Sequence, residues 1–324
     1  MEIRSLAAGN LRLRNNVLLA PMAGYTDYAF RSFQLKSGAG FCFTELVSAK
    51  GLCYGGRGSK ELLYCGTESD IALTGAQLFG GEAYYIRKAA ESEALSGFSA
   101  IDINMGCPVP KLFNNGEGSA LLQDILRAEN IIKECVKSGK TVTVKIRTGI
   151  KRGDDVAAEF AKMAEQAGAA MVTVHGRTRE DYYSGEPDYR AIERAVRAVK
   201  IPVIANGGIF TVQDAESMLE RTGAAGVMIA RGAIKNPFLV CELLKNAPPC
   251  NLKEYMAEQL KLMASEKGAS RTVKEFRKFA PYYVRGGEGA KELRMRMVSA
   301  ESLAELEEII EENADTINKI RNNR

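Results

Sequence analysis

The feature that most constrains the fold is the alternation of eight short β-rich runs with segments of helical pattern, which is typical of βα units and a parallel sheet. The runs are Val17–Ala20, Phe41–Thr44, Ile71–Gln77, Ala100–Asn104, Thr141–Arg147, Met171–His175, Pro202–Asn206 and Val227–Ala230. Eight such units close a TIM (β/α)8 barrel, whose usual length of about 250 residues suits this part of the chain. A doubly wound open sheet is the alternative that the pattern leaves.

The region after the eighth run has a different pattern. Pro248 and Pro249 interrupt the alternation, and the chain from Leu252 to Arg324 has helical periodicity without a convincing strand. We therefore predict an α/β fold in which a TIM (β/α)8 barrel over residues 1–245 is followed by a small C-terminal all-α helical domain over residues 246–324.

The composition excludes several classes of protein. The chain is 46% hydrophobic and 26% charged, has no apolar run long enough to span a membrane, and begins without a secretory pattern. Its seven cysteines form no C-x-x-C pair and its one histidine is His175, which argues against a disulfide framework and a metal site. We expect a metal-free cytoplasmic protein with reduced thiols and, by default, a monomer.

Charge is distributed unevenly near the end of the chain. The net charge of +4 is too small to establish nucleic-acid binding, but residues 267–296 are rich in Lys and Arg and residues 301–315 are acidic. The basic segment is either a solvated helical face or a surface that contacts phosphates.

Residues Asn104 to Lys111, Asn-Met-Gly-Cys-Pro-Val-Pro-Lys, set a thiol directly after the fourth run. Gly106 permits a sharp turn and Pro108 restricts the backbone beyond it, so Cys107 is held at a strand end. A thiol with a pKa near ~8.5 is mostly protonated at neutral pH and can act as a general acid. A buried structural cysteine is the alternative.

The active site of a TIM barrel forms where the strands end, so the residues at those eight positions are informative. In chain order they are Pro21, Met22 and Ala23, then Glu45, Gln77, Asn104 with Cys107, Lys145, His175, Asn206 with Gly207 and Gly208, and Arg231.

These strand-end residues suit a phosphorylated flavin. Gly207 and Gly208 offer backbone N–H groups and Arg231 a charged donor for a phosphate, although the glycines could also form only a tight turn. Gln77 can bond the pyrimidine edge of FMN, and Lys145 can stabilise negative charge on the reduced ring. A solvated lysine at the strand tip is the alternative for Lys145.

Five stretches of the sequence resemble the tRNA-dihydrouridine synthase family, most closely its DusB-like bacterial branch, and the resemblance extends from about Asn15 to Met297. The stretches are Leu19–Asp27, Asp102–Pro108, Val144–Gly149, Val174–Arg179 and Phe276–Lys278. The resemblance implies reduction of the C5=C6 bond of uridine in tRNA, with NADPH as reductant, hydride passing from reduced FMN to C6, and a proton passing from Cys107 to C5.

The resemblance also implies the roles of other residues. FMN would contact Pro21, Met22, Ala23, Gln77, Lys145, His175, Asn206, Gly207, Gly208, Ala230 and Arg231. The tRNA substrate would contact Asn104, Arg177, Arg179, Arg271, Lys274, Arg277 and Lys278, with Arg294 and Arg296 as further candidates for phosphate contacts.

Three positions depart from the family pattern, which often has His, Asp and Gly where this chain has Phe279, Gly208 and Ala230. The first change removes a possible tRNA contact, and the others could alter flavin affinity. Two other functions stay open: a flavin oxidoreductase of the dihydroorotate dehydrogenase type acting on a free pyrimidine, and a tRNA-binding or folding protein with a vestigial flavin site.

Overall fold

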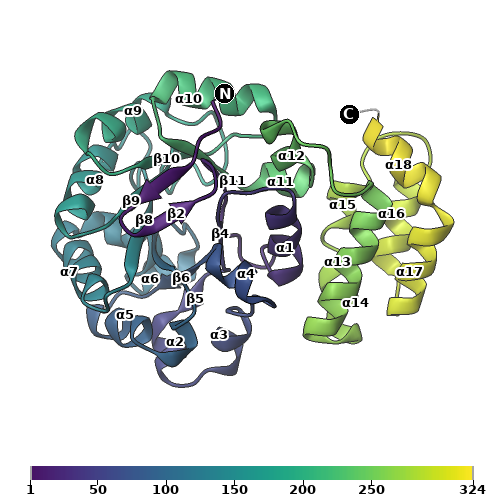
Figure 1. Ribbon diagram of the computed structural model, residues 1–324, viewed down its shortest axis with the longest axis horizontal. Coiled ribbons are helices and arrows are strands. Elements are labelled where there is room, and N and C mark those ends of the chain that lie inside the picture. The colour runs from purple at the N-terminus through teal and green to yellow at the C-terminus, as the bar shows by residue number, and fades with distance from the viewer. Residues whose placement is uncertain (1, 323–324) are drawn as a thin grey trace.

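Eight parallel strands form a nearly closed barrel in the computed structural model, which describes residues 2–322 (Figure 1). They are β3 (Val17–Leu19), β4 (Cys42–Phe43), β6 (Thr74–Phe79), β7 (Ala100–Met105), β8 (Thr141–Arg147), β9 (Met171–His175), β10 (Val203–Asn206) and β11 (Gly226–Ile229). The sheet order is β3-β11-β10-β9-β8-β7-β6-β4, and a parallel bridge between Leu18 and Phe41 brings its two ends together. The predicted TIM barrel is confirmed.

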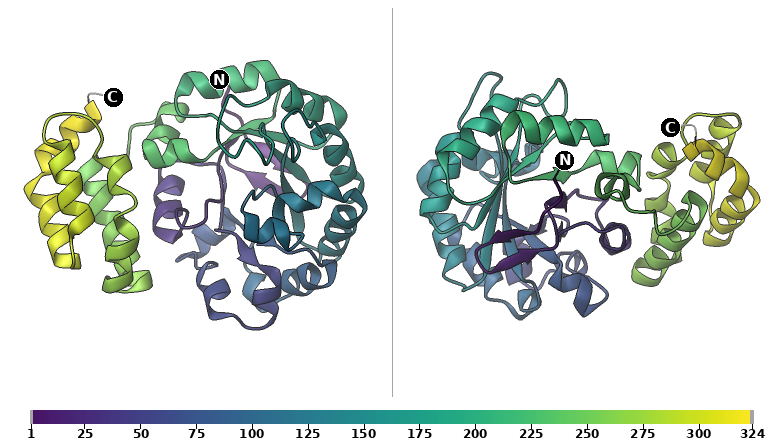
Figure 2. Two further views of the ribbon diagram at one scale, coloured as in Figure 1. Left: turned by 180° about the vertical axis from the view of Figure 1, so that it is seen from behind. Right: turned by 45° about the horizontal axis from the view of Figure 1, so that its top comes forward.

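A short hairpin closes the amino end of the barrel. Its antiparallel strands are β1 (Leu6–Ala8) and β2 (Leu11–Leu13). Leu11 and Leu13 belong to an apolar cluster with Phe41, Ala100 and Met171, which lie at or beside the first residues of their strands. Figure 1 views the barrel from the hairpin side and the left panel of Figure 2 from behind. The carboxyl ends of the strands therefore lie opposite the hairpin, which the sequence did not predict.

Helices surround the barrel on the outside (Figure 2). They are α1 (Tyr28–Lys36), α2 (Ala49–Cys53), α3 (Arg57–Glu61), α4 (Glu68–Ala72), α5 (Ala83–Ala90), α6 (Pro110–Asn114), α7 (Ile125–Val136), α8 (Ala157–Gln166), α9 (Tyr189–Ala198), α10 (Val212–Thr222), α11 (Arg231–Lys235) and α12 (Leu239–Leu244). The predicted start of the third run at Ile71 was wrong, because Thr67 caps α4 by accepting from the Asp70 N–H at 3.1 Å. A further short strand, β5 (Val47–Ser48), pairs with the end of β6.

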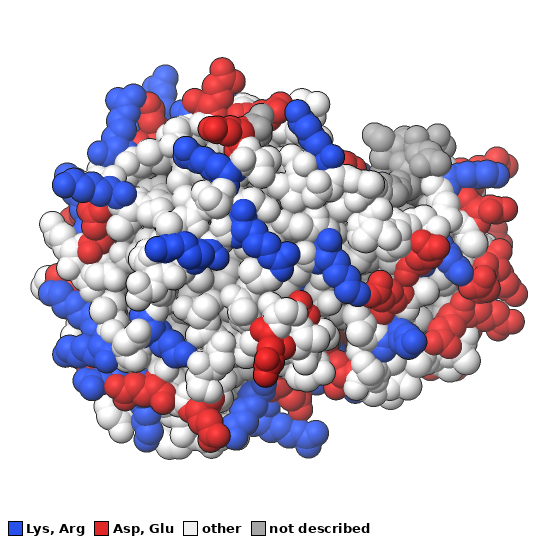
Figure 3. All heavy atoms as spheres, viewed as in Figure 1, with Lys and Arg blue, Asp and Glu red and all other residues white. Residues whose placement is uncertain are grey.

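Six helices follow the barrel and form a separate layer beside it (Figure 1). They are α13 (Leu252–Lys267), α14 (Ala269–Phe276), α15 (Ala280–Tyr283), α16 (Ala290–Ser299), α17 (Leu303–Glu312) and α18 (Ala314–Asn322). We call them the helical region. On the hairpin side, carboxylates gather over this region while Lys and Arg are spread over the barrel (Figure 3). The division of the chain at residue 245 remains a prediction.

Aromatic rings join the helical region to the barrel. The Phe33 ring of α1 lies 4.1 Å from the Tyr255 ring of α13, and Phe279 stacks on Phe30 at 6.1 Å and meets Tyr25 edge-on at 5.5 Å. Phe279 is 0% exposed. The departure at this position therefore places an apolar side chain inside the junction, and its effect on contact with tRNA remains a prediction.

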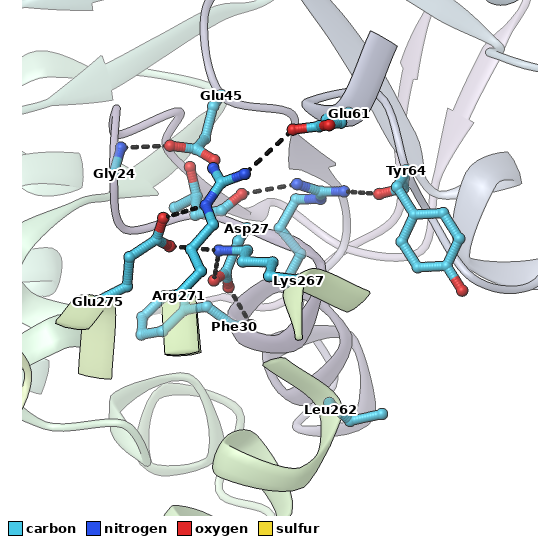
Figure 4. Close-up of polar contacts among 12 residues, drawn as sticks. Gly24, Asp27, Phe30, Glu45, Glu61, Tyr64, Leu262, Lys267, Arg271 and Glu275 are labelled. Atoms are coloured by element: carbon cyan, nitrogen blue, oxygen red, sulfur yellow. Dashed lines mark hydrogen bonds and ion pairs between the residues drawn. The ribbon is translucent and has the colours of Figure 1, made fainter. Parts of the chain in front are cut away.

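Ion pairs complete this junction (Figure 4). The Lys267 ammonium lies 2.6 Å from an Asp27 carboxylate oxygen and 2.7 Å from one of Glu275, and its side chain is 8% exposed. Arg271 pairs with Glu275 at 2.6 Å and with Glu61 at 3.0 Å. Burial alone would lower the pKa of Lys267, but Asp27 and Glu275 together outweigh it and raise that pKa. The junction thus supplies its own counterions.

Candidate active site at the carboxyl end of the barrel

Strand periodicity places several polar side chains inside the barrel, toward the carboxyl ends of the strands. Residues two apart on a strand share a face, so Asp102 lies on the same face of β7 as Asn104, and Lys145 on the same face of β8 as Arg147. The register pairs Asn104 with Lys145, and Arg147 with His175 on β9. The side chains predicted from three separate motifs therefore meet at one end of the barrel.

A chain of hydrogen bonds connects three of these strands to the cysteine turn. Asp102 accepts from the Thr143 hydroxyl at 2.6 Å and from the Gln77 Nε2 at 2.7 Å. The Gln77 Oε1 accepts from the Asn104 Nδ2 at 2.9 Å. The Asn104 Oδ1 in turn accepts from the backbone N–H of Cys107 at 2.9 Å. Side chains from β6, β7 and β8 thus fix the start of the turn.

Cys107 lies in this turn and is partly exposed. Its carbonyl accepts from the Ser119 hydroxyl at 2.8 Å, and Arg147 donates to the neighbouring carbonyl of Gly106 at 2.8 Å. Burial raises the pKa of the Cys107 thiol, although the cations of Arg147 and Lys145 act in the opposite direction. The thiol is therefore protonated at neutral pH, which suits a proton donor better than a nucleophile.

Lys145 reaches the same end of the barrel from β8. Its Nζ donates to the Asn206 Oδ1 at 3.0 Å, and the Asn206 Nδ2 donates to the carbonyl of Met228 at 2.7 Å. The pKa of Lys145 is lowered to about 8, mainly by burial and next by the nearby Arg147, while Asp102 acts in the opposite direction. No carboxylate is bonded to this ammonium within residues 2–322, so an amide oxygen is its anchor.

His175 is neutral and held by an arginine. Its side chain is buried, and the Arg177 Nη1 lies 3.2 Å from the His175 Nε2. A guanidinium can only donate, so Nε2 accepts and the ring proton resides on Nδ1. Burial lowers the pKa of His175 well below 6.5, and the cations of Arg147, Lys145, Arg177 and Arg231 lower it further. His175 is unsuited to donating from an imidazolium.

Gly207 and Gly208 follow β10 with backbone φ angles of +115° and +70°. A Cβ at Gly207 would lie 2.8 Å from the His175 ring, and one at Gly208 would lie 2.9 Å from a Pro187 side-chain carbon. The departure at position 208 therefore matches Pro187 packed against it. Ala230, the other departure near the flavin positions, has φ −117°, which needs no glycine.

The remaining residues predicted to contact FMN lie on the rim. Pro21 and Met22 are partly exposed and Ala23 is exposed, directly after β3. The Arg231 guanidinium is partly exposed and lies over the Tyr183 ring at 4.5 Å. The positions of these residues do not test their predicted contacts with FMN. The set of FMN-binding residues therefore remains a prediction.

The two arginines after His175, Arg177 and Arg179, make contacts within the protein. Arg177 is 5% exposed and also donates to the carbonyls of Ser184 at 3.0 Å and Gly185 at 2.6 Å. The Arg179 guanidinium lies 3.7 Å from the centre of the Phe113 ring, on the helix α6 that follows Cys107. Burial of Arg177 does not favour the predicted contact with tRNA, whereas Arg179 is partly exposed.

The basic residues predicted in the helical region differ in availability. Arg271 is ion-paired, and Arg277 is half-buried and donates to the carbonyl of Ala300. Lys278 is partly exposed above the Tyr25 ring at 5.4 Å, and its one ion pair among the described residues is a long one of 3.9 Å to Glu275. Lys274 is exposed and, within the described residues, makes no ion pair. Lys274 and Lys278 are thus the best placed of the four to meet an external phosphate.

A cleft of about 1220 Å³ separates part of the barrel from the helical region. Gly24 and Glu45, at the ends of β3 and β4, line it together with Arg271 and Lys278 from α14 and its C-terminal side. Glu45 accepts from the Gly24 N–H (Figure 4). Neither Cys107 nor Lys145 is among the described residues that line the cleft, so it borders the site at the first two strands and does not contain it.

Asp102 and Arg147 are functional candidates that the sequence analysis missed. Both are charged and buried, at 0% and 2% exposure, on strands that also carry the polar residues Asn104 and Lys145. Each lies two residues from a predicted site residue, Asn104 and Lys145 respectively, and so on the same face of its strand. That spacing was a signal available in the sequence.

A family model described as dihydrouridine synthase matches residues 18–320. The chain belongs to this family. Relatives include tRNA-dihydrouridine synthase B of Pseudomonas putida, 38% identical over 303 residues that cover 90% of this chain and 89% of that protein. A probable tRNA-dihydrouridine synthase of Rickettsia bellii is 41% identical over 237 residues, which cover 72% of each chain. The predicted family, with its DusB-like branch, and the predicted class of flavin-dependent oxidoreductase are confirmed.

Solved structures share the fold at low sequence identity. Morphinone reductase in complex with tetrahydroNAD has a TM-score of 0.56 at 14% identity, covering 76% of this chain and 91% of that one. The old yellow enzyme homologue of Zymomonas mobilis has a TM-score of 0.57 at 14% identity, covering 75% and 92%. In the described part of the chain, no helix is long and apolar enough to cross a membrane, and no three His, Cys, Asp or Glu side chains gather as metal ligands.

Proposed function

We propose that this dihydrouridine synthase family member is an FMN-dependent tRNA-dihydrouridine synthase that reduces the C5=C6 bond of uridine in tRNA with electrons from NADPH. The observation that carries the proposal is the arrangement at the barrel end: a protonated, partly exposed Cys107 thiol close to the Lys145 ammonium and the neutral His175 ring. A proton donor and an anion stabiliser are the two groups that such a reduction needs from the protein.

The donor set fits a flavin mononucleotide. Four cations, Lys145, Arg147, Arg177 and Arg231, lie close enough to His175 to lower its pKa, so the site has an excess of positive charge. An anionic ligand would balance that charge, with Arg231 and the backbone of Gly207 and Gly208 holding the phosphate, and Gln77 and Lys145 the pyrimidine edge. When bound, FMN supplies the hydride that reaches C6 of the uracil.

The residues of the chain supply the second half of the reduction. The Cys107 S–H donates its proton to C5, and the resulting thiolate regains a proton from solvent, so one hydride and one proton are added in each turnover. Arg147 and Lys145 stabilise the transient thiolate. Asn104 donates an N–H to the base, and His175 orients the base or binds the flavin without transferring a proton.

The cleft beside the barrel end offers a path for tRNA. A uridine in folded tRNA must leave its stack to reach a flavin, and its flanking backbone then needs cationic contacts. Lys278 lines the cleft and Lys274 lies four residues before it, and both would neutralise phosphates. Arg179 supports the turn after Cys107 through Phe113 and would contact the same strand of RNA.

The test is turnover on unmodified tRNA transcripts with the FMN-loaded protein and NADPH, followed by mass spectrometry of the nucleosides. We expect dihydrouridine, a uridine carrying two additional hydrogen atoms, in tRNA but not from free uridine. Equal reduction of free pyrimidines would favour the dihydroorotate dehydrogenase type of enzyme. Binding of tRNA by flavin-loaded protein without any reduction would favour a binding or folding role.

A further inference from the structure

We infer that Asp102 is a positioning residue that sets the orientation of the two amides, Gln77 and Asn104, and thereby leaves N–H groups for the ligand at the barrel end. Asp102 itself lies behind these amides, at 0% exposure, and has no contact with the ligand in this scheme. The inference deepens the proposed function, because it concerns which edge of a pyrimidine ring the site accepts.

The orientation follows from the two ends of the hydrogen-bond chain. At one end the ionised Asp102 carboxylate can only accept, so Gln77 must direct its NH2 group toward it, at 2.7 Å. At the other end the backbone N–H groups of Gly106 and Cys107 can only donate, so Asn104 must direct its oxygen toward them, at 3.2 and 2.9 Å. The remaining bond, from Asn104 to Gln77 at 2.9 Å, fits only this direction.

Reversing the direction would leave donors facing donors. If Gln77 turned its oxygen toward position 102, its NH2 group would face the NH2 group of Asn104. Turning Asn104 as well would point its NH2 group at the backbone N–H of Cys107. The direction is therefore fixed from both ends, with Asp102 anchoring Gln77 at one end and the backbone of the cysteine turn anchoring Asn104 at the other.

The hydrogen-bond donors available to a ligand are those that the chain does not use in its own hydrogen bonds. The Asn104 oxygen accepts from both backbone N–H groups of the turn. Its NH2 group donates one N–H to Gln77, so one N–H remains for an external acceptor. Gln77 likewise keeps one N–H after bonding Asp102. Ring edges with carbonyl oxygens match these donors, whereas an exocyclic amino group would meet an N–H with no acceptor.

Packing alone would not favour a carboxylate at position 102, because its burial is unfavourable in free energy. Thr143 and Gln77 beside it are 0% and 1% exposed, and burial raises the pKa of Asp102 to about 6. A buried ionised carboxylate is commonly less favourable than an apolar side chain of similar size. A role in orienting the amides accounts for a carboxylate at this position.

The test compares three variants as purified proteins. D102L/T143V replaces the carboxylate and its hydroxyl partner by apolar side chains and removes the anchor of Gln77. T143V alone removes only the hydroxyl partner and leaves the chain through Gln77 intact. D102N keeps an acceptor for Gln77, and its new N–H can donate to the Thr143 hydroxyl, so hydrogen bonding is retained and charge is lost.

The first readout is the dissociation constant of FMN for each apoprotein. We expect D102L/T143V to weaken binding about tenfold, which is the loss of roughly one well-made hydrogen bond, and T143V and D102N to stay within about threefold of wild type. We also expect reduced FMN to lose about tenfold more affinity than oxidised FMN in D102L/T143V, a shift of about 30 mV in the two-electron midpoint potential.

Two results would overturn the inference. An unchanged FMN affinity and potential in D102L/T143V would show that the amides need no anchor, and a loss in D102N equal to that in D102L/T143V would show that charge acts instead of orientation. D102V/T143V provides the same comparison if D102L/T143V does not fold. Failure of the wild-type apoprotein to bind FMN would instead contradict the proposed function.

Discussion

Two partly buried lysines, Lys145 in the barrel and Lys267 in the junction, have opposite shifts in pKa. Lys267 lies between the carboxylates of Asp27 and Glu275, which raise its pKa in spite of burial. Lys145 is bonded to an amide oxygen of Asn206, and burial lowers its pKa to about 8. The Lys267 ammonium is ion-paired with two carboxylates, whereas the Lys145 ammonium is bonded to an amide and Asp102 raises its pKa less than burial and Arg147 lower it.

The difference separates a structural region from a functional one. At the junction, Lys267 is paired with carboxylates, and aromatic rings such as Phe279 and Tyr255 pack between the barrel and the helical region. The charges of this region therefore need no external ligand. At the barrel end, Lys145 and three arginines surround a neutral His175 and leave positive charge unbalanced. We interpret an unbalanced buried charge as the part of the site that a ligand completes.

The largest effect is expected from C107A. Loss of a positioned general acid should reduce dihydrouridine formation at least about 100-fold, while FMN affinity and the unfolding free energy change little, because the thiol is partly exposed. Single-turnover assays on tRNA would measure this. C250A is the matched control, since Cys250 is also partly exposed but lies directly before the N-cap of α13 and does not line the cleft. Equal losses in both variants would contradict a chemical role for Cys107.

K267M should separate the junction from the barrel end. Removing the ammonium leaves Asp27 and Glu275 buried without their partner, which should lower the unfolding free energy by about 3 kcal/mol. FMN affinity should stay within about twofold, because no strand of the barrel is altered. Urea unfolding followed by circular dichroism and an FMN titration would measure the two quantities. A large loss of FMN affinity with unchanged stability would contradict the assignment of Lys267 to a structural junction.

The pH dependence should sharpen the comparison further. Lys145 is charged below its pKa of about 8 and neutral above it, so stabilisation of reduced flavin and turnover should fall as pH rises through about 8. K145R keeps its charge there, so its alkaline limb should move to higher pH even if its maximal rate is lower. Rates measured on both proteins between about pH 6 and about pH 10 test this, because that range brackets the Lys145 pKa of about 8 and stays below the ordinary lysine pKa near ~10.4. Superimposable profiles would remove Lys145 from the redox site.

The smallest effect is expected at the surface. K274A should weaken tRNA binding only about threefold and reduce the slope of log affinity against log salt by about one unit, as loss of one phosphate contact does. K162A, an exposed lysine of α8 on the outside of the barrel, serves as the control. Indistinguishable salt slopes for K274A and wild type would exclude Lys274 from the tRNA contact surface.

Local sequence patterns were sufficient for the barrel. β-rich runs at regular spacing predicted all eight strands, and the rule that sites form at strand ends selected Cys107, Lys145 and His175, which the register brings to one end. The same rule passed over Asp102, because it examines where strands end and Asp102 lies inside β7. Arg147 does end β8, but Lys145 was selected on that strand and Arg147 was not considered.

The junction could not be predicted in the same way. Its ion pair joins Asp27 to Lys267, residues 240 positions apart, and no periodic pattern connects them. The burial of Phe279 likewise depends on Phe30 and Tyr25 from the start of the barrel. Motif comparison identified Phe279 as unusual, but its consequence for packing required the three-dimensional arrangement.

The most direct measurement is the flavin content of three purified proteins, wild type, K145M and K267M, from visible absorbance relative to protein concentration. If the unbalanced charge of the barrel end is completed by a flavin, wild type and K267M should carry it and K145M should lose most of it, although K267M is the less stable protein. A colourless wild-type protein that also fails to take up FMN, or a K145M protein with full flavin content, would contradict the account.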